Sequence, residues 1–357
     1  LIDDFVAQRS REFEVGRQAR FLKGSGLPLR IPVIEMVEIG AGGGSIARVD
    51  GLNQITIGPD SAGAEPGPAA YGRGGERPTI TDADIHLGRI DLVRFAGGQV
   101  ALKPDLAATA LQSDIGDKLE LSSLMAAYGV TEMVDETMAN DARVHAVEQG
   151  KVASEYTLIA FGGAAPLHVG RLAEKLSINR IVIPTNAGVG SAVGFLRAPI
   201  SYEVVRSRNL RLRQFDVKII NSIFDEMYKE AKLVVEPAAP EGNCEQKRLA
   251  YMRYLGQGHE ISVPLPNRTF TDEDAPFFQA AFNENYQRLY QRILPNAEVE
   301  ILTWGLTLTA PSPALNQLIS NTVNKKHVSS QETRAIFDSG IRKMKHIPVY
   351  VRSCLSP

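Results

Sequence analysis

The order of short motifs over residues 156–188 constrains the fold more than any other part of the sequence. YTLIAFGGAAPLHVGRLAEKLSI contains a short apolar strand, a Gly-Gly turn and an amphipathic helix, and RIVIPTNAG then reads as a second strand. The order strand, helix, strand is typical of a parallel α/β layer. We therefore predict an α/β fold for this part of the chain.

A second set of strands is expected around the glycines near residue 42. IPVIEMVEIG (31–40) predicts a buried strand that leads into GAGGGS. SIARVD and GLNQITIGP then predict a hairpin through Asp50-Gly51, a dipeptide that suits a tight turn. The loop that follows, from 60 to 91, is rich in Gly, Pro and small residues, so we expect it to be either mobile or shaped around a ligand.

The pattern turns helical from about 104 to 149, where Val130, Val134, Met138 and Ala142 form one apolar stripe that we assign to the core. After about residue 205, strand-like segments such as RLAYMRYLGQGHEISVPLP and VEILTWGLTLTA predict an antiparallel α+β domain. We therefore expect two domains, 1–205 and 206–357.

The bulk composition excludes several classes of partner. The 357 residues carry a net charge of -2, without the basic excess that favours nucleic acid or anionic membranes. Only Cys244 and Cys354 are present, which argues against a disulfide scaffold and favours a reducing compartment. We expect a cytoplasmic protein with no membrane partner. Because the chain opens at Leu1 in mid-pattern and stops just after a strand-like segment, we also expect it to be part of a longer one.

GAGGGS (40–45) leaves consecutive backbone N–H groups unobstructed, as phosphate-binding nests do. Gly42, Gly43, Gly44 and Ser45 are therefore candidate contacts for a phosphate or a substrate oxygen. The alternative is a tight hairpin or bulge that needs glycine for its own geometry. The spacing matches neither the P-loop nor the dinucleotide-binding fingerprint.

FGGAAP (161–166) lies at the carboxyl end of a predicted strand and opens a helix, which is where open α/β sheets bind ligands. The helix N-terminus adds unpaired N–H groups and a partial positive charge. Gly162, Gly163 and Ala164 are therefore candidate nucleotide contacts. The alternative is a plain strand-to-helix turn.

TDADIHLGR (81–89) places Asp82, Asp84 and His86 at alternating positions. In an extended segment these side chains would share one side and could hold Mg²⁺ or polarise water. The alternative is capping by Thr81 and Asp82 before a short helical turn. His168, early in the helix after FGGAAP, is the best-placed imidazole. Asp82, Asp84 and His168 are thus the candidate catalytic residues, for metal, water or proton transfer, with their individual roles and the metal left open.

Five blocks in this order resemble the hydantoinase A / 5-oxoprolinase family. The similarity is strong from about residue 30 to 210 and continues weakly through MRYLGQGHEISVPLP. The blocks are GAGGGSIARVD, GPDSAGAEPGPAAYGRGG, PTITDADIHLGR, FGGAAPLHVGRLAEKL and VGSAVGFLRAPISYEVVRS.

The resemblance implies half of an actin/Hsp70-like, ribonuclease-H-like ATPase core, followed by the α+β domain. It implies ATP and Mg²⁺ or another divalent metal as cofactors, and ATP-dependent hydrolysis of a cyclic amide such as a hydantoin or 5-oxoproline. FGGAAP corresponds to the adenosine-side Gly-Gly motif of that superfold, and GAGGGS would lie near the phosphates or the substrate. Alternatives are a ketone carboxylase subunit with the same ATP chemistry and a non-catalytic scaffold.

The family's N-terminal D-x-G-G-T phosphate motif and its second G-G-T turn have no counterpart in this sequence, and Ala165 stands where relatives often carry Gly. We therefore expect this chain to form one wall of the cleft and to show little ATP turnover alone. The resemblance also implies a hydantoinase B-like partner subunit in a multi-subunit complex, and an oligomer.

Overall fold

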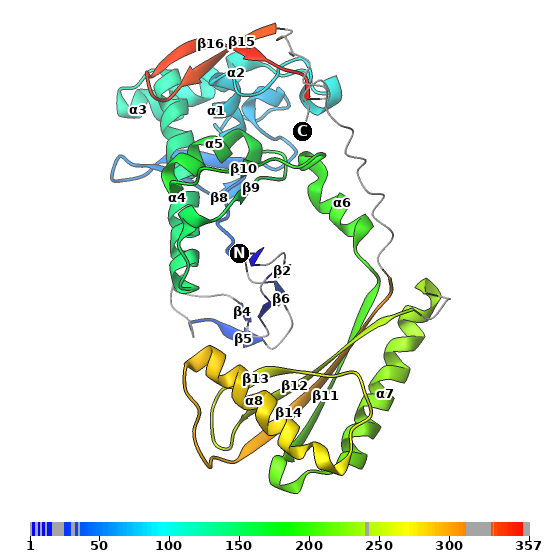
Figure 1. Cartoon of the computed structure of the whole chain (residues 1–357). Helices are drawn as coiled ribbons and strands as arrows, with labels where there is room; N and C mark the ends of the chain where they lie inside the picture. The colour runs from blue at the N-terminus through cyan, green and yellow to red at the C-terminus, as the bar shows by residue number, and fades with distance from the viewer. Residues whose placement is uncertain are drawn as a thin grey trace. The chain divides into compact units, whose positions relative to one another are not determined.

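The computed structural model divides the chain into two compact units, Leu1–Val193 with Thr322–Pro357, and Gly194–Asn321. The residues that it describes are 2–3, 6–7, 9–10, 13–15, 25–29, 33–34, 36–239, 243–311, 330 and 332–352. Figure 1 gives the element labels.

The first unit contains a β-hairpin that confirms the expected pairing of SIARVD with QITIG. Strands β7 (Ser45–Val49) and β8 (Ile55–Ser61) are antiparallel. Oδ1 of Asp50 accepts hydrogen bonds from the N–H groups of Leu52 and Gln54, which closes the turn between them. On the other side of β7, the N–H of Ala47 donates to the Pro78 carbonyl, at the start of helix α1 (Ile80–His86).

The prediction of a strand over 31–40 is wrong for residues 36–40. Strand β6 (Val33–Ile34) pairs with β3 (Arg9–Ser10), residues 36–40 form no strand, and Met36 is 63% exposed. Gly40 has a φ of +61°, which takes the chain out of extended geometry just before the glycine turn. Residues 31, 32 and 35 lie outside the described part of the chain. The remaining short strands before residue 30 are β1 (Ile2–Asp3), β2 (Val6–Ala7), β4 (Phe13–Val15) and β5 (Leu27–Leu29).

The helical region expected over 104–149 is confirmed as α2 (Pro104–Leu111), a π-helical turn, α3 (Asp117–Leu119) and the long α4 (Ser123–Glu148). Val130 and Val134 on α4 are buried in a cluster with residues of β7, α1 and α2, and Met138 packs against that cluster. The apolar stripe therefore does form core, as its spacing predicts.

The parallel unit is also confirmed. Strands β9 (Leu158–Ile159) and β10 (Ile181–Val182) pair in parallel, and α5 (Ala165–Leu176) connects them (Figure 1). Leu158, Leu176 and Ile178 belong to a small apolar cluster that packs α5 and β9 on α4. Helix α6 (Gly190–Arg197) follows.

Strands β15 (Glu332–Asp338) and β16 (Lys343–Val349) pack on the first unit, whereas the sequence placed them in a domain spanning 206–357. The N–H of Phe337 donates to the Leu87 carbonyl, and Phe337 is buried against the core of α1 and α4. An ion pair of 2.6 Å between Arg334 and Asp91 adds to this contact.

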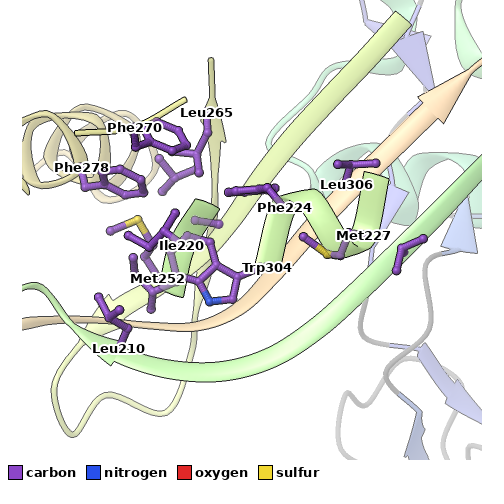
Figure 2. Packing of buried hydrophobic residues seen from close by; sticks show 14 of the residues in the cluster. Leu210, Ile220, Phe224, Met227, Met252, Leu265, Phe270, Phe278, Trp304 and Leu306 are labelled. Atoms are coloured by element: carbon purple, nitrogen blue, oxygen red, sulfur yellow. The ribbon is translucent and has the colours of Figure 1, made fainter. Parts of the chain in front are cut away.

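The second unit is the expected antiparallel α+β domain, although β11 begins at Ser201, before the expected boundary at 205. Its sheet has the order β11-β14-β12-β13, with every pair antiparallel. Trp304 is fully buried at its centre, and Phe224 and Phe278, one from each helix, pack edge-on against the indole (Figure 2). The elements are β11 (Ser201–Arg211), α7 (Val217–Val235), β12 (Glu245–Tyr254), β13 (Ile261–Leu265), α8 (Ala275–Tyr290) and β14 (Val299–Thr309).

Gly88 allows β15 to approach the end of α1. A Cβ atom on Gly88 would lie 2.1 Å from the Ala335 carbonyl oxygen, and the φ of Gly88 is +75°. Gly97 has a similar φ of +68°, but a Cβ atom there would meet nothing within 4 Å. The two positions therefore separate backbone strain from steric conflict.

We predict that Gly97→Ala lowers the free energy of unfolding by about 1–2 kcal/mol, through its left-handed φ alone. Gly88→Ala should cost roughly 3 kcal/mol, because the clash with β15 adds to that strain. Urea unfolding of both variants measures the difference. Equal losses would contradict the role given to Gly88.

Candidate functional site

The glycines of GAGGGS are held against neighbouring backbone. The Gly43 carbonyl accepts from the Thr81 N–H at the start of α1, and the Gly44 carbonyl accepts from the Ala62 N–H. A Cβ atom on Gly43 would lie 2.6 Å from Thr81 Oγ1, and one on Gly44 would lie 2.9 Å from Ser61 Oγ. A side chain at either position would therefore require the Thr81 or Ser61 hydroxyl to move.

Two hydrogen bonds between Gly42 and Ser45 close the turn. The Ser45 hydroxyl accepts a 3.0 Å hydrogen bond from the Gly42 N–H, and the Ser45 N–H donates to the Gly42 carbonyl. Ser45 is buried. The geometry thus favours the structural alternative for GAGGGS, and phosphate contact by Gly42, Gly43, Gly44 and Ser45 stays a prediction.

Asp82 organises the Gly- and Pro-rich loop from within. Its carboxylate accepts hydrogen bonds from the N–H groups of Ala69, Ala70 and Thr79 and from the Thr79 hydroxyl, at 2.7 to 3.1 Å. Asp82 is fully buried, and this burial raises the pKa of its carboxyl, an effect that the donors partly oppose. The loop is therefore shaped around one of the chain's own carboxylates.

The alternating segment TDADIH is helical, so the extended geometry that would place its three polar side chains together is wrong. Thr79 and Asp82 form a capping box at the start of α1, which confirms the capping alternative, with Thr79 in the position expected for Thr81. Asp82 faces the 69–70 turn, Asp84 faces α5, and His86 contacts the Ser123 hydroxyl at 3.0 Å.

Asp84 and His168 meet in a buried cluster that sequence reasoning only half identified. The Nε2 atom of His168 lies 3.1 Å from Asp84 Oδ2, and its Nδ1 atom lies 2.8 Å from Oδ1 of Asp135 on α4. Each of the three residues is 3% exposed or less. Asp135 was missed, although a signal was present: it is an acid that directly follows Val134 of the apolar stripe.

The geometry of the cluster favours a protonated imidazole. Each ring nitrogen faces a carboxylate oxygen, and only the imidazolium donates from both nitrogens. Burial alone would lower the pKa of His168, but the hydrogen bonds and charges of Asp135 and Asp84 outweigh it and raise the pKa to about 9. Arg89 adds a second cation, 3.0 Å from Asp84 Oδ1, so two positive groups balance two carboxylates.

The turn FGGAAP is open at both of its glycines, whereas GAGGGS is open at Gly42 but closed at Gly43 and Gly44. Gly162 has a φ of +102°, and a Cβ atom on Gly162 or Gly163 would meet nothing within 4 Å. Ala164 directly precedes α5 and makes no side-chain cap for it. The Gly162 N–H donates to the Ala187 carbonyl at 2.7 Å, so the loops after β9 and β10 lie together at the carboxyl ends of parallel strands. This is where α/β sheets place their ligands.

Comparisons with known proteins agree with this arrangement. A family model described as hydantoinase/oxoprolinase matches residues 2–204. An uncharacterized protein of Methanocaldococcus jannaschii is 36% identical over 304 residues, covering 84% of this chain and 43% of that protein. The chain belongs to the hydantoinase/oxoprolinase family.

Two further relatives extend the comparison within the hydantoinase/oxoprolinase family. The caprolactamase subunit alpha of Pseudomonas jessenii is 32% identical over 284 residues, covering 78% of this chain and 41% of that subunit. A solved nucleotide-free structure of acetone carboxylase matches with a TM-score of 0.75 at 24% identity, covering 93% of this chain and 48% of that one. The chain therefore spans less than half the length of these relatives.

The acidic residues of the site do not fit a divalent metal. The carboxylate oxygens of Asp82 and Asp84 already accept hydrogen bonds from protein donors. Over the ranges that the structure describes, no group of three or more His, Cys, Asp or Glu side chains could hold a metal ion.

Among the described residues, no helix is both long and apolar enough to cross a membrane.

The buried imidazolium makes stability depend on pH. Because the pKa of His168 is raised from 6.5 to about 9 on folding, its contribution is full below pH 6.5 and is lost as the pH rises through about 9. We expect the free energy of unfolding to fall by about 3 kcal/mol across this window, since each pKa unit corresponds to about 1.4 kcal/mol.

Urea titrations at several pH values measure this loss, and His168→Gln is the control. The variant should lose most of the pH dependence over the same window. An equal decline in wild type and His168→Gln would show that another group is responsible.

Proposed function

We propose that this chain contributes the nucleotide-binding loop of an ATP-dependent enzyme that hydrolyses a cyclic amide of the hydantoin or 5-oxoproline type. The observation that carries the proposal is the open Gly162–Gly163 backbone at the N-terminus of α5. An unobstructed backbone lets a flat ring or a phosphate come close, and the first N–H groups of a helix favour an anion. Similarity to caprolactamase subunit alpha supports an amide substrate.

Bound ATP would supply the phosphoryl group that activates the amide oxygen for attack by water. The residues of this chain would bind and orient the nucleotide. Gly162, Gly163 and Ala164 would offer their backbone, while Asp84 and His168 would hold α5 in place rather than exchange protons. Asp82 would also have a structural role, because its carboxylate accepts hydrogen bonds from the N–H groups of the 69–70 turn.

We further propose that residues 1–205 belong to an actin/Hsp70-like ATPase core and that a hydantoinase B-like subunit completes the enzyme. The parallel β9–α5–β10 unit and the similarity in fold to acetone carboxylase support the first idea. The description of a relative as subunit alpha supports the second.

Ketone carboxylation is the second candidate, because the acetone carboxylase structure covers 93% of this chain. Both reactions would use the same loop for ATP, so the loop does not distinguish them. ADP release measured with cyclic amides and with ketones plus bicarbonate assigns the substrate class. A scaffold without catalytic function would bind no nucleotide at all.

Gly163→Val tests the nucleotide loop. Gly163 has no left-handed φ and a Cβ atom there meets nothing, so valine should fold normally while blocking the approach of a ligand. We expect ATP binding to the whole gene product that contains this chain to weaken at least about a hundredfold, or about 2.7 kcal/mol. Calorimetric titration with ATP and Mg²⁺ measures it.

Gly170→Val is the matched control. Gly170 lies on the same helix, is exposed, and also has open space at its Cβ position. Its affinity for ATP should equal that of the wild type. Unchanged affinity in Gly163→Val, or no binding by the wild type, would refute the proposed site.

A further inference from the structure

Besides the apolar cluster around Leu176, two sets of polar contacts attach α5 to α4, and they lie at different turns of α5. His168 is the fourth residue of α5, so it lies about 4.5 Å along the axis from Ala165. Asp135 contacts it there, 2.8 Å from Nδ1. Further along, Glu132 contacts Arg171 at 2.7 Å and Lys175 at 3.1 Å, in partly exposed ion pairs. Only the first set lies next to the FGGAAP turn.

The Gly-Gly turn is anchored on one side, where the Gly162 N–H donates to the Ala187 carbonyl. On the other side it runs into α5, where Ala164 provides no side-chain cap. Glycine backbone is conformationally free unless its surroundings restrain it. The position of Gly162 and Gly163 therefore depends on how firmly the first turn of α5 is held.

Asp135 is devoted to that contact. Its Oδ1 atom bonds His168, while its Oδ2 atom is buried and has no hydrogen-bond partner among the described residues. A buried carboxylate with one unpaired oxygen destabilises the fold, and the attraction between Asp135 and the His168 cation offsets this cost.

We propose that Asp135 is a positioning residue for the nucleotide loop: together with Asp84 it clamps the His168 imidazolium and so holds Gly162 and Gly163 in the conformation that receives ATP. The inference rests on the proposed function of that loop. Asp135 touches no ligand and acts through His168.

Asp135→Asn tests the clamp, because it keeps the shape of the side chain and removes its charge. We expect amide hydrogen exchange over residues 160–167 to accelerate roughly tenfold, as local opening becomes easier. ATP binding should weaken about tenfold, because the loop must then be ordered on binding. The KM for ATP should rise more than kcat falls.

Glu132→Gln is the matched control, since it weakens the α4–α5 contact at later turns. It should lower the melting temperature but leave exchange over 160–167 and the affinity for ATP unchanged. A merely structural Asp135 would behave in the same way. Equal exchange and equal ATP affinity in Asp135→Asn and Glu132→Gln would overturn the proposal.

The pH dependence of amide hydrogen exchange in the wild-type protein provides a second test, which does not require that a variant folds. The charged groups around His168 are Asp84 on α1, Asp135 on α4 and Arg89 beside Asp84. Exchange over 160–167, corrected for its intrinsic pH dependence, should rise above about pH 9 relative to residues 170–176. A flat ratio would overturn the clamp. Absence of ATP binding by the wild type would refute the nucleotide site alone, because exchange still reports on the clamp.

Discussion

The buried contact of His168 with Asp84 and Asp135 is the interaction on which the candidate site depends. It joins α1, α4 and α5 at one point inside the first unit. An isolated charge would be very costly in this interior, but two cations and two carboxylates nearly cancel. Since the contact lies in the first turn of α5, it fixes the element that carries the open Gly-Gly backbone.

The glycines of the two glycine-rich turns have different surroundings. At Gly43 and Gly44 the missing side chains let the turn pack against α1 and the end of β8. At Gly162 and Gly163 the same lack of side chains leaves space that no described atom fills. Glycine content alone therefore does not locate a ligand site. Open space at Cβ does not locate one either, since Gly170 has it too, and at Gly162 and Gly163 it counts because the two glycines precede a helix at the carboxyl ends of parallel strands.

Local patterns predicted most of the elements. Two errors have local causes, namely the left-handed Gly40 after residues 36–39 and the capping box that makes TDADIH helical. The other errors come from distant contacts. Periodicity and turn residues were sufficient for the β7–β8 hairpin, the β9–α5–β10 unit and the antiparallel sheet around Trp304. The attachment of β15 to the first unit depends on Phe337 and Gly88, which are 249 residues apart in the numbering. Asp135 was missed for the same reason, because its role depends on a contact with His168, which lies 33 residues later in the sequence.

Nitrogen-15 NMR of the His168 ring tests whether the buried imidazole is charged, because the shifts of its two nitrogens report which of them carry protons. We expect an imidazolium with protons on both nitrogens at neutral pH and a pKa of about 9. A neutral ring with one protonated nitrogen at pH 7.5, titrating near the ordinary histidine value of about 6.5, would contradict it.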